Sequence, residues 1–200
     1  VGFTTCYPIN ESSQDFPITV YDINKLAAEK YLFYYASEMG GRASTLRLAN
    51  VYGPGPQSRH ADRGILNMMV RKALAGEALI VYGVGGFVRD YIFIEDVVSA
   101  FLTAGTKIRS INGNYYVLGS GEGHSIKEMI EMVQKVVLNV TGVRVPIRHL
   151  PPPDQLPRID FRHFVADNKK FCKDTGWKPK VSFEEGVART VRHFSKETKS

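Results

Sequence analysis

Residues 21–25 of the chain, Tyr-Asp-Ile-Asn-Lys, run directly into the amphipathic stretch Leu26 to Ala36. The phenol of Tyr21 and the amine of Lys25 are four residues apart, and on a helix side chains at this spacing share one face. An ammonium group beside a phenol favours the phenolate form. Tyrosine and lysine also meet at this spacing by chance in many helices. With support from the rest of the chain, the pair predicts a helix that moves a proton onto or off a hydroxyl.

Around this stretch, helical segments alternate with short runs of strand-forming residues. Gly40-Gly41 ends the first helix, and the glycines and prolines at 53–56 cannot continue regular structure. The strand before them delivers Asn50 to a loop, at the edge where open parallel sheets bind ligands. The elements predicted up to residue 105 are a loop over Val1–Pro17, helices over Tyr21–Met39, Gly64–Ala75 and Glu95–Gly105, and strands over Ala43–Leu48, Leu79–Tyr82 and Asp90–Ile94.

The second half of the chain continues the alternation. Ser125 is a favourable N-cap for the helix that follows it, and the prolines at 151–153 indicate a loop. The elements predicted here are a strand over Asn114–Leu118, a β-branched run over Val143–Leu150, and helices over Ile126–Val137, Asn168–Thr175 and Phe183–Thr198. Alternating elements of this kind predict an α/β architecture.

Composition indicates a folded protein and excludes several functional classes. Of the 200 residues, 44% are hydrophobic and 11% aromatic, which is enough for one large or two small domains. The net charge of +6 comes from scattered lysines and arginines, and no nucleic-acid-binding motif accompanies it. No apolar run approaches the ~20 residues of a membrane span. The five histidines and the two cysteines, Cys6 and Cys172, lack metal-ligand spacing, so we expect no metal site and a cytoplasmic protein with reduced thiols.

Several motifs follow one another along the chain and extend the Tyr-Lys pair. Together they resemble the extended short-chain dehydrogenase/reductases, and within them the NAD-dependent nucleotide-sugar epimerases and dehydratases. The resemblance covers almost all of the sequence. The stretches that carry it are 21–25, 47–54 (Arg-Leu-Ala-Asn-Val-Tyr-Gly-Pro), 81–83 (Val-Tyr-Gly), 89–98 (Arg-Asp-Tyr-Ile-Phe-Ile-Glu-Asp-Val-Val), 119–123 and 175–179.

The resemblance implies a fold as well as a chemistry. We expect the C-terminal part of a Rossmann-type, doubly wound parallel sheet with an interleaved, smaller α/β substrate domain. Residues 1–110 would complete the NAD-binding domain, interleaved with substrate-domain segments at about 54–80, and residues 111–200 would mainly bind the sugar nucleotide. The family's Gly-rich dinucleotide turn is missing, and the glycines at 83–86 are expected to form a loop. We therefore expect part of a longer enzyme, or a gene product that has lost its dinucleotide half.

The resemblance also assigns roles in catalysis and cofactor binding. It implies that Tyr21 is the acid/base at a sugar hydroxyl and that Lys25 holds the nicotinamide ribose of NAD, with Ala49 as a further cofactor-binding position. The third catalytic residue of the family, a Ser or Thr, is expected just upstream of residue 1. Thr4 and Thr5 are then expected to be loop threonines.

For the substrate, the resemblance implies a nucleotide-diphosphate sugar. Asn50 and Arg89 would bind its diphosphate, although Arg89 also allows a surface ion pair with Asp90. Arg162 is a second candidate arginine, with Arg158 as its rival. Asp96, at a helix start, is expected to be a cap and not a catalyst. The positions that would cradle the base, and that would otherwise be ordinary core, are Ile65, Leu66, Val81 and Tyr82.

Three functions remain open at this point. The leading one is an NAD-dependent epimerase that passes through a transient 4-keto sugar, and the second is a 4,6-dehydratase. The acidic pair that distinguishes many dehydratases would lie upstream, so the sequence does not choose between them. The third is a catalytically silent fragment that binds a sugar nucleotide or a partner. A homodimer through an apolar face of Leu26–Ala36 is also possible.

Overall fold

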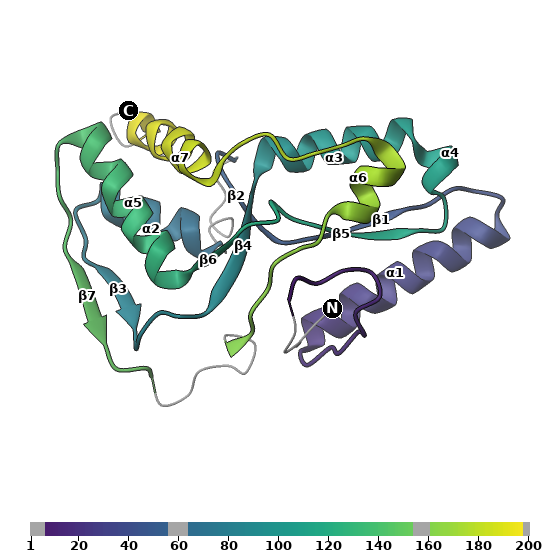
Figure 1. Ribbon diagram of the computed structural model, residues 1–200, viewed down its shortest axis with the longest axis horizontal. Coiled ribbons are helices and arrows are strands. Elements are labelled where there is room, and N and C mark those ends of the chain that lie inside the picture. Colours follow the sequence, from purple (N-terminus) through teal and green to yellow (C-terminus); the bar gives the residue numbers. More distant parts are fainter. Residues whose placement is uncertain (1–6, 56–63, 154–160, 198–200) are drawn as a thin grey trace.

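The computed structural model describes residues 7–55, 64–153 and 161–197. Figure 1 shows most of the strands in the middle of the molecule with helices on either side, whereas the other two, residues 79–82 and 147–150, lie at its left edge. The helices are α1 (Val20–Glu38), α2 (Ile65–Leu74), α3 (Ile94–Thr106), α4 (Ile108–Ile111), α5 (Ile126–Thr141), α6 (Lys169–Thr175) and α7 (Phe183–Glu197). The strands are β1 (Thr45–Leu48), β2 (Asn50–Tyr52), β3 (Leu79–Tyr82), β4 (Val88–Phe93), β5 (Tyr115–Leu118), β6 (Gly123–Ser125) and β7 (Ile147–Leu150).

The strands pair mainly in parallel. β1 pairs with β5, β2 with β4, and β3 with β7, and in each pair the two strands are separated by at least one helix in the sequence. The one antiparallel pairing among the described strands joins β4 to β6. Parallel strands joined through helical crossovers confirm the predicted α/β class.

Strand β4 separates two hydrophobic cores. Tyr91 and Phe93 belong to the core that α2, α5 and α7 cover. Ile92, between them, belongs to the core of α3, β5 and α6. Alternate residues of a strand point to opposite faces, so one strand contributes to both cores, and Figure 1 shows it running between the two groups of helices. Residues from before and after position 110 contribute to each core. The predicted division of the chain into domains at residue 110 stays a prediction.

Helix ends follow local sequence. Thr19 accepts a hydrogen bond from the backbone N–H of Asp22 at the start of α1. Ser125 is the N-cap of α5, as predicted, and forms a reciprocal capping box with Glu128. Gly142 ends α5 in the left-handed conformation, which costs glycine little because it has no Cβ.

Several predictions need correction. Asn50 does not enter a loop, because it is the first residue of β2. This three-residue strand pairs with Tyr91 to Phe93 of β4 and ends before Gly53-Pro54. Asp96 does not cap its own helix α3, because its carboxylate accepts hydrogen bonds from the backbone N–H groups of Lys180 and Val181. The short elements α4 and β6 were not predicted, since four- and three-residue segments show no periodicity.

The carboxylate of Asp90 organises the middle of the molecule. It is fully buried and accepts hydrogen bonds from the backbone N–H groups of Ser120 (2.7 Å), Gly121 (3.0 Å) and Ala166 (3.1 Å), and from the Ser120 hydroxyl (2.7 Å). A Cβ at Gly119 would overlap it. Arg89 is also buried, so the alternative of a surface ion pair between Arg89 and Asp90 is wrong.

We expect Asp90→Asn to lower the free energy of unfolding by about 3 kcal/mol, because an amide NH₂ then faces buried N–H donors that have no other acceptor. Glu131→Gln is the matched control. Glu131 is exposed on α5, 3.8 Å from Lys127, and its loss is expected to change stability by less than about 0.5 kcal/mol. Urea unfolding followed by circular dichroism measures both, and equal midpoints for the two variants would contradict the role of Asp90.

Candidate functional site

A pocket of about 490 Å³ lies between the start of α1 and the carboxyl end of β1. It brings together five residues that the sequence singled out from three separate segments. Tyr21 and Lys25 come from α1, Ala49 and Asn50 follow β1, and Arg162 comes from the segment after residue 160. This convergence is the basis for treating the pocket as the candidate active site.

The predicted proximity of Tyr21 and Lys25 is confirmed. The Lys25 Nζ lies 5.6 Å from the centre of the Tyr21 ring. Both side chains are exposed at the pocket, so the phenol oxygen is open to a ligand. Because Thr19 caps the first turn, the helical geometry that pairs the two residues is held at its start.

Ala49 and Asn50 lie where the chain changes partners. The Ala49 N–H donates to the Leu118 carbonyl at 2.7 Å, which extends the β1–β5 pairing by one residue. Asn50 then pairs with Tyr91 of β4. The prediction that Asn50 follows the carboxyl end of a parallel strand is therefore confirmed, although the next segment is a strand.

Two arginines meet beside the pocket. The Arg89 guanidinium donates to the carbonyl of Arg162 and, at 3.1 Å, to that of Val88. The Nε of Arg162 is buried and has no hydrogen-bond partner among the described residues. Its rival Arg158 lies outside the described residues, as do Thr4 and Thr5. Arg162 therefore carries a donor that a ligand could satisfy.

The four positions expected to cradle a base do not line this pocket. Leu66 and Val81 are buried in the core that α2, α5 and α7 cover, so only their backbone remains for a ligand. Ile65 is half-buried against the same core, and Tyr82 is exposed at the end of β3. Their contacts with a nucleotide stay a prediction.

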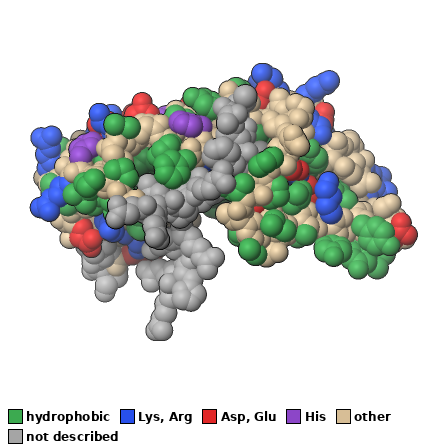
Figure 2. Space-filling view, turned by 90° about the horizontal axis from the view of Figure 1, so that it is seen from below, with side chains coloured by type: hydrophobic (Ala, Val, Ile, Leu, Met, Phe, Trp, Pro, Cys, Tyr) green, Lys and Arg blue, Asp and Glu red, His purple; other side chains and the backbone are tan. Residues whose placement is uncertain are grey.

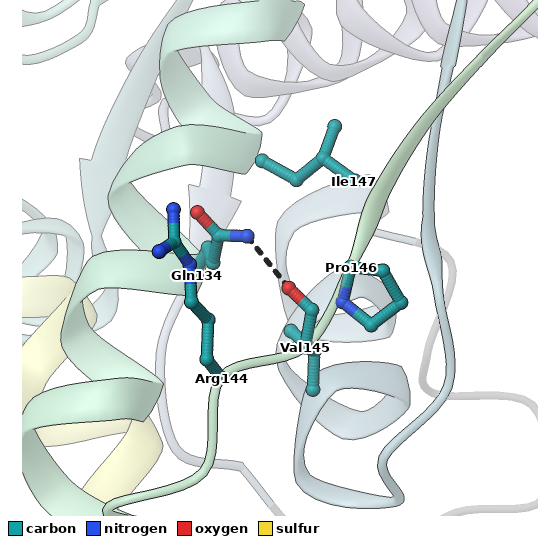
Figure 3. Close-up of a pocket in the computed structure, with 5 residues that line it drawn as sticks. All are labelled: Gln134, Arg144, Val145, Pro146 and Ile147. Atoms are coloured by element: carbon teal, nitrogen blue, oxygen red, sulfur yellow. Dashed lines mark hydrogen bonds between the residues drawn. The ribbon is translucent and has the colours of Figure 1, made fainter.

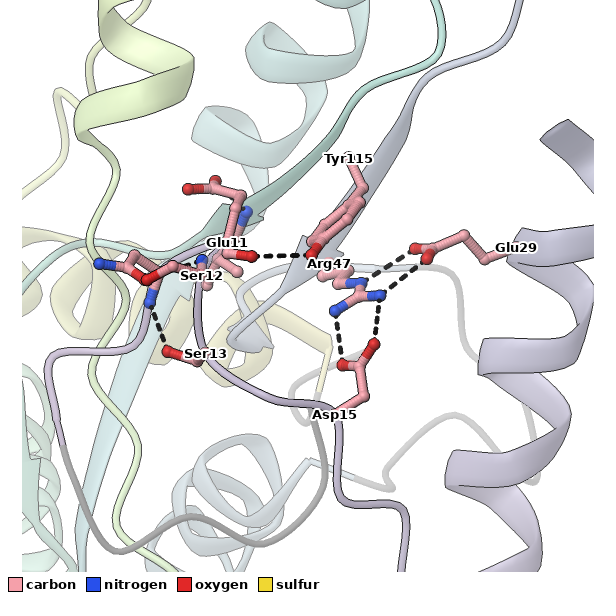
Figure 4. Close-up of polar contacts among 9 residues, drawn as sticks. Glu11, Ser12, Ser13, Asp15, Glu29, Arg47 and Tyr115 are labelled. Carbon is pink, nitrogen blue, oxygen red and sulfur yellow. Dashed lines mark hydrogen bonds and ion pairs between the residues drawn. The ribbon is translucent and has the colours of Figure 1, made fainter.

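Sequence reasoning missed an ion-pair cluster on the wall of the pocket, shown in Figure 4. We call Arg47, Asp15 and Glu29 the Arg47 bridge. Arg47 donates to the two oxygens of Asp15 at 2.7 and 3.0 Å, and to those of Glu29 at 2.7 and 2.9 Å. Its guanidinium carbon also lies 3.9 Å from the centre of the Tyr115 ring. Both carboxylates therefore hold Arg47 in a bidentate manner.

The charges of the Arg47 bridge support one another. Burial lowers the pKa of Arg47, but the hydrogen bonds and charges of Glu29 and Asp15 outweigh it and raise the pKa above its usual value. Burial likewise raises the pKa of Asp15, and Arg47 outweighs this and holds it below its usual value. The sequence gives only part of this cluster: Glu29 is four residues from Lys25 and eight from Tyr21, on the same helical face, but this spacing does not point to Arg47 or Asp15.

A second pocket, also about 490 Å³, lies between α5 and β7 and is shown in Figure 3. The Gln134 amide donates to the Val145 carbonyl at 2.6 Å and closes one side of it. None of the residues predicted from the sequence lines this pocket. Its remaining lining residues are Arg144, Pro146 and Ile147.

In residues 7–55, 64–153 and 161–197, no three His, Cys, Asp or Glu side chains are grouped so that they could hold a metal ion. The helices in these same ranges include none with the length and apolar character needed to cross a membrane.

The chain is similar to known proteins over most of its length. The family model described as "NAD dependent epimerase/dehydratase family" matches residues 4–119. A UDP-glucose 4-epimerase of Mycolicibacterium smegmatis is 32% identical over 96% of this chain and 58% of its own length. A dTDP-glucose 4,6-dehydratase of Xanthomonas campestris pv. campestris is 31% identical over 90% of this chain and 50% of its own.

Solved structures show the same fold. The crystal structure of a UDP-glucose 4-epimerase from Thermotoga maritima with UDP-glucose superposes with a TM-score of 0.83 at 32% identity, covering 98% of this chain and 59% of that one. The chain thus spans between half and three fifths of the length of these relatives. Since the family model covers more than half of the chain, the chain belongs to the NAD-dependent epimerase/dehydratase family.

Proposed function

We propose that the complete protein carrying this sequence is an NAD-dependent nucleotide-sugar epimerase in which Tyr21 is the acid/base. The observation that supports this most is the meeting of Tyr21, Lys25, Asn50 and Arg162 at one pocket. A phenol, an ammonium, an amide and a guanidinium there can serve a sugar hydroxyl at one end and a diphosphate at the other. The similarity to UDP-glucose 4-epimerases points the same way.

The chain's residues fit one part of NAD. The exposed ammonium of Lys25 has three N–H donors for ribose hydroxyls, and Ala49 follows the nearby strand end. The glycine loop at 83–86 does not fit the pyrophosphate: it joins two strands, and a Cβ at Gly85 would lie 2.7 Å from Val81 and 3.1 Å from Lys127. When bound, NAD supplies the redox chemistry by accepting a hydride from a sugar carbon and returning it.

Tyr21 handles the proton that accompanies this exchange. Its oxygen takes the proton of the sugar hydroxyl while the carbon loses a hydride, which leaves a transient ketone. In the second half of the reaction the ketone is reduced: the carbon regains the hydride on its other face, and Tyr21 gives the proton back to the oxygen. The ammonium of Lys25 lies beside the ring and places a positive charge next to the group that exchanges the proton.

Asn50 and Arg162 would hold the diphosphate. The buried Nε of Arg162 has no acceptor within the described part of the chain, and an unpaired buried donor costs about 1–3 kcal/mol unless a ligand satisfies it. A diphosphate offers acceptors in the geometry that guanidinium groups match. Arg89, whose guanidinium contacts the Arg162 carbonyl, would support this arginine.

A second candidate is nucleotide-sugar 4,6-dehydration, which the similarity to a 4,6-dehydratase favours. It shares the first step, since the hydroxyl must be oxidised before water can leave. A chain that binds a sugar nucleotide without turnover is the third, and it follows from the absent Gly-rich turn. All three candidates would use Arg162 to bind the sugar nucleotide. Epimerisation and dehydration also need Tyr21 as acid/base, whereas binding without turnover does not.

Two further proposals concern the state of the protein. A homodimer is supported by the exposed side chains of α1, and Figure 2 shows hydrophobic side chains gathered at the end of the molecule where this helix lies. A cytoplasmic location is supported by the low cysteine count and by Cys172, which is a free thiol. The exposed large hydrophobic side chains of α1 are Val20, Ile23, Tyr31, Leu32, Tyr34 and Tyr35, together with Tyr21.

For Tyr21→Phe we expect kcat for conversion of UDP-glucose to fall by about 10²–10⁴-fold, because the general acid/base is lost, with KM little changed. Tyr31→Phe, on the same helix and similarly exposed, is the control and should retain activity. Full activity of Tyr21→Phe would exclude its role as acid/base.

Arg162→Gln is expected to weaken binding of UDP or dTDP by roughly 10–100-fold, since a hydrogen bond to a charged group contributes about 1.5–3 kcal/mol. Isothermal titration calorimetry measures this without turnover. Arg148→Gln, on β7 and exposed, removes the same charge away from the pocket and should leave affinity unchanged. Equal affinities for the two variants would assign the diphosphate to other residues.

A further inference from the structure

Helix α1 is attached to the rest of the molecule in an unusual way. Its single buried residue is Glu29, whose side chain is 4% exposed. Its apolar positions are at most half-buried, among them Leu26, Phe33 and Ala36. An ionised side chain such as a carboxylate is very costly to bury without a partner. Glu29 can therefore be buried only because a positive charge lies beside it.

That charge is the guanidinium of Arg47, whose position and orientation are fixed by its contacts in the Arg47 bridge. Four hydrogen bonds of 2.7–3.0 Å fix it between Glu29 and Asp15. The Tyr115 ring covers one face at 3.9 Å, and the Tyr115 hydroxyl is itself fixed to the Glu11 carbonyl at 2.7 Å. Figure 4 shows Glu29 reaching the guanidinium from the helix and Asp15 from the loop. Because the pairs are bidentate and planar, they restrict direction as well as distance.

The bridge joins the two walls of the candidate active site. Glu29 lies one helical turn beyond Lys25 and about two beyond Tyr21. Arg47 lies on β1, three residues before Asn50. Glu29 and Arg47 both line the same pocket as these groups. A shift of α1 along its axis would move the Tyr21 oxygen relative to Asn50, and the Glu29–Arg47 contact opposes that shift.

We propose that Glu29 and Arg47 are positioning residues for proton transfer: their bidentate contact sets the place of α1 against β1, and thereby the distance from the Tyr21 oxygen to the reacting sugar hydroxyl. This inference rests on the proposed function, since it gives Tyr21 the role of acid/base. Asp15 holds the same guanidinium but belongs to the N-terminal loop. It orients Arg47 without carrying the helix.

The test is Glu29→Gln in the complete protein. The amide keeps the shape and the partial burial of α1, so the helix stays docked, but it removes the charge and one acceptor facing Arg47. A misplacement of about 1 Å costs up to about 10²-fold in rate. We therefore expect kcat to fall by roughly 10–100-fold, with the KM for the sugar nucleotide within about 3-fold, at a temperature well below the melting point of the variant.

Asp15→Asn is the matched control, because it makes the same chemical change against the same guanidinium. It is expected to lower kcat by less than about 3-fold, since the contact of Arg47 with α1 remains. An equal loss of kcat in both variants would overturn the proposal and leave the bridge a general structural element. So would a Glu29→Gln variant that loses melting temperature but keeps kcat.

A double variant separates this inference from the proposed function. If Glu29 acts through Tyr21, adding Glu29→Gln to Tyr21→Phe should cost no further rate, because the group being positioned is gone. Additive losses would overturn the positioning role. If Tyr21→Phe alone is fully active, the proposed function fails, whatever Glu29→Gln does.

Discussion

The Arg47 bridge is the interaction on which the candidate site depends. One guanidinium satisfies two carboxylates from separate segments, the N-terminal loop and helix α1. Strand β5 takes part through Tyr115 and through Val117, whose N–H donates to the Glu11 carboxylate at 2.8 Å. Removing Arg47 would leave the Glu29 carboxylate buried without its charged partner, which costs far more than the loss of a surface ion pair. The Arg47 side chain therefore joins the loop and the helix to β1, and Glu11 adds a separate contact between the loop and β5.

The position of the pocket follows from a change of partner in the backbone. At Ala49 the chain leaves β5 and joins β4, so the two parallel pairs diverge beside Asn50. In open α/β sheets, ligands bind where the carboxyl ends of strands diverge in this way. The buried carboxylate of Asp90 holds β4 to the loops at Ser120 and Ala166 on one side of this point. On the other side the Arg47 bridge holds α1.

Periodicity predicted the long elements, and only the short ones were missed. The strand over Leu79–Tyr82 and the start of α5 at Ser125 match their sequence signals, because each depends on residues within a few positions. Strand β2 has three residues and exists through its pairing with β4. The Arg47 bridge was missed because it too depends on contacts between distant parts of the chain. Asp15, Glu29 and Arg47 are up to 32 residues apart, and no local pattern relates their charges.

Epimerisation and dehydration differ in the acids that they need. Epimerisation needs one group that takes a hydroxyl proton and returns it, whereas loss of water also needs a group to protonate the departing hydroxide. Among the described residues, Asp22 and Glu29 are the carboxylates that line the pocket. Glu29 is committed to Arg47, and Asp22 accepts from the Ile18 N–H at 3.4 Å at the helix start. Tyr21 is the proposed acid/base that stays exposed in the described part of the pocket, and it would serve the hydroxyl oxidation that both reactions share.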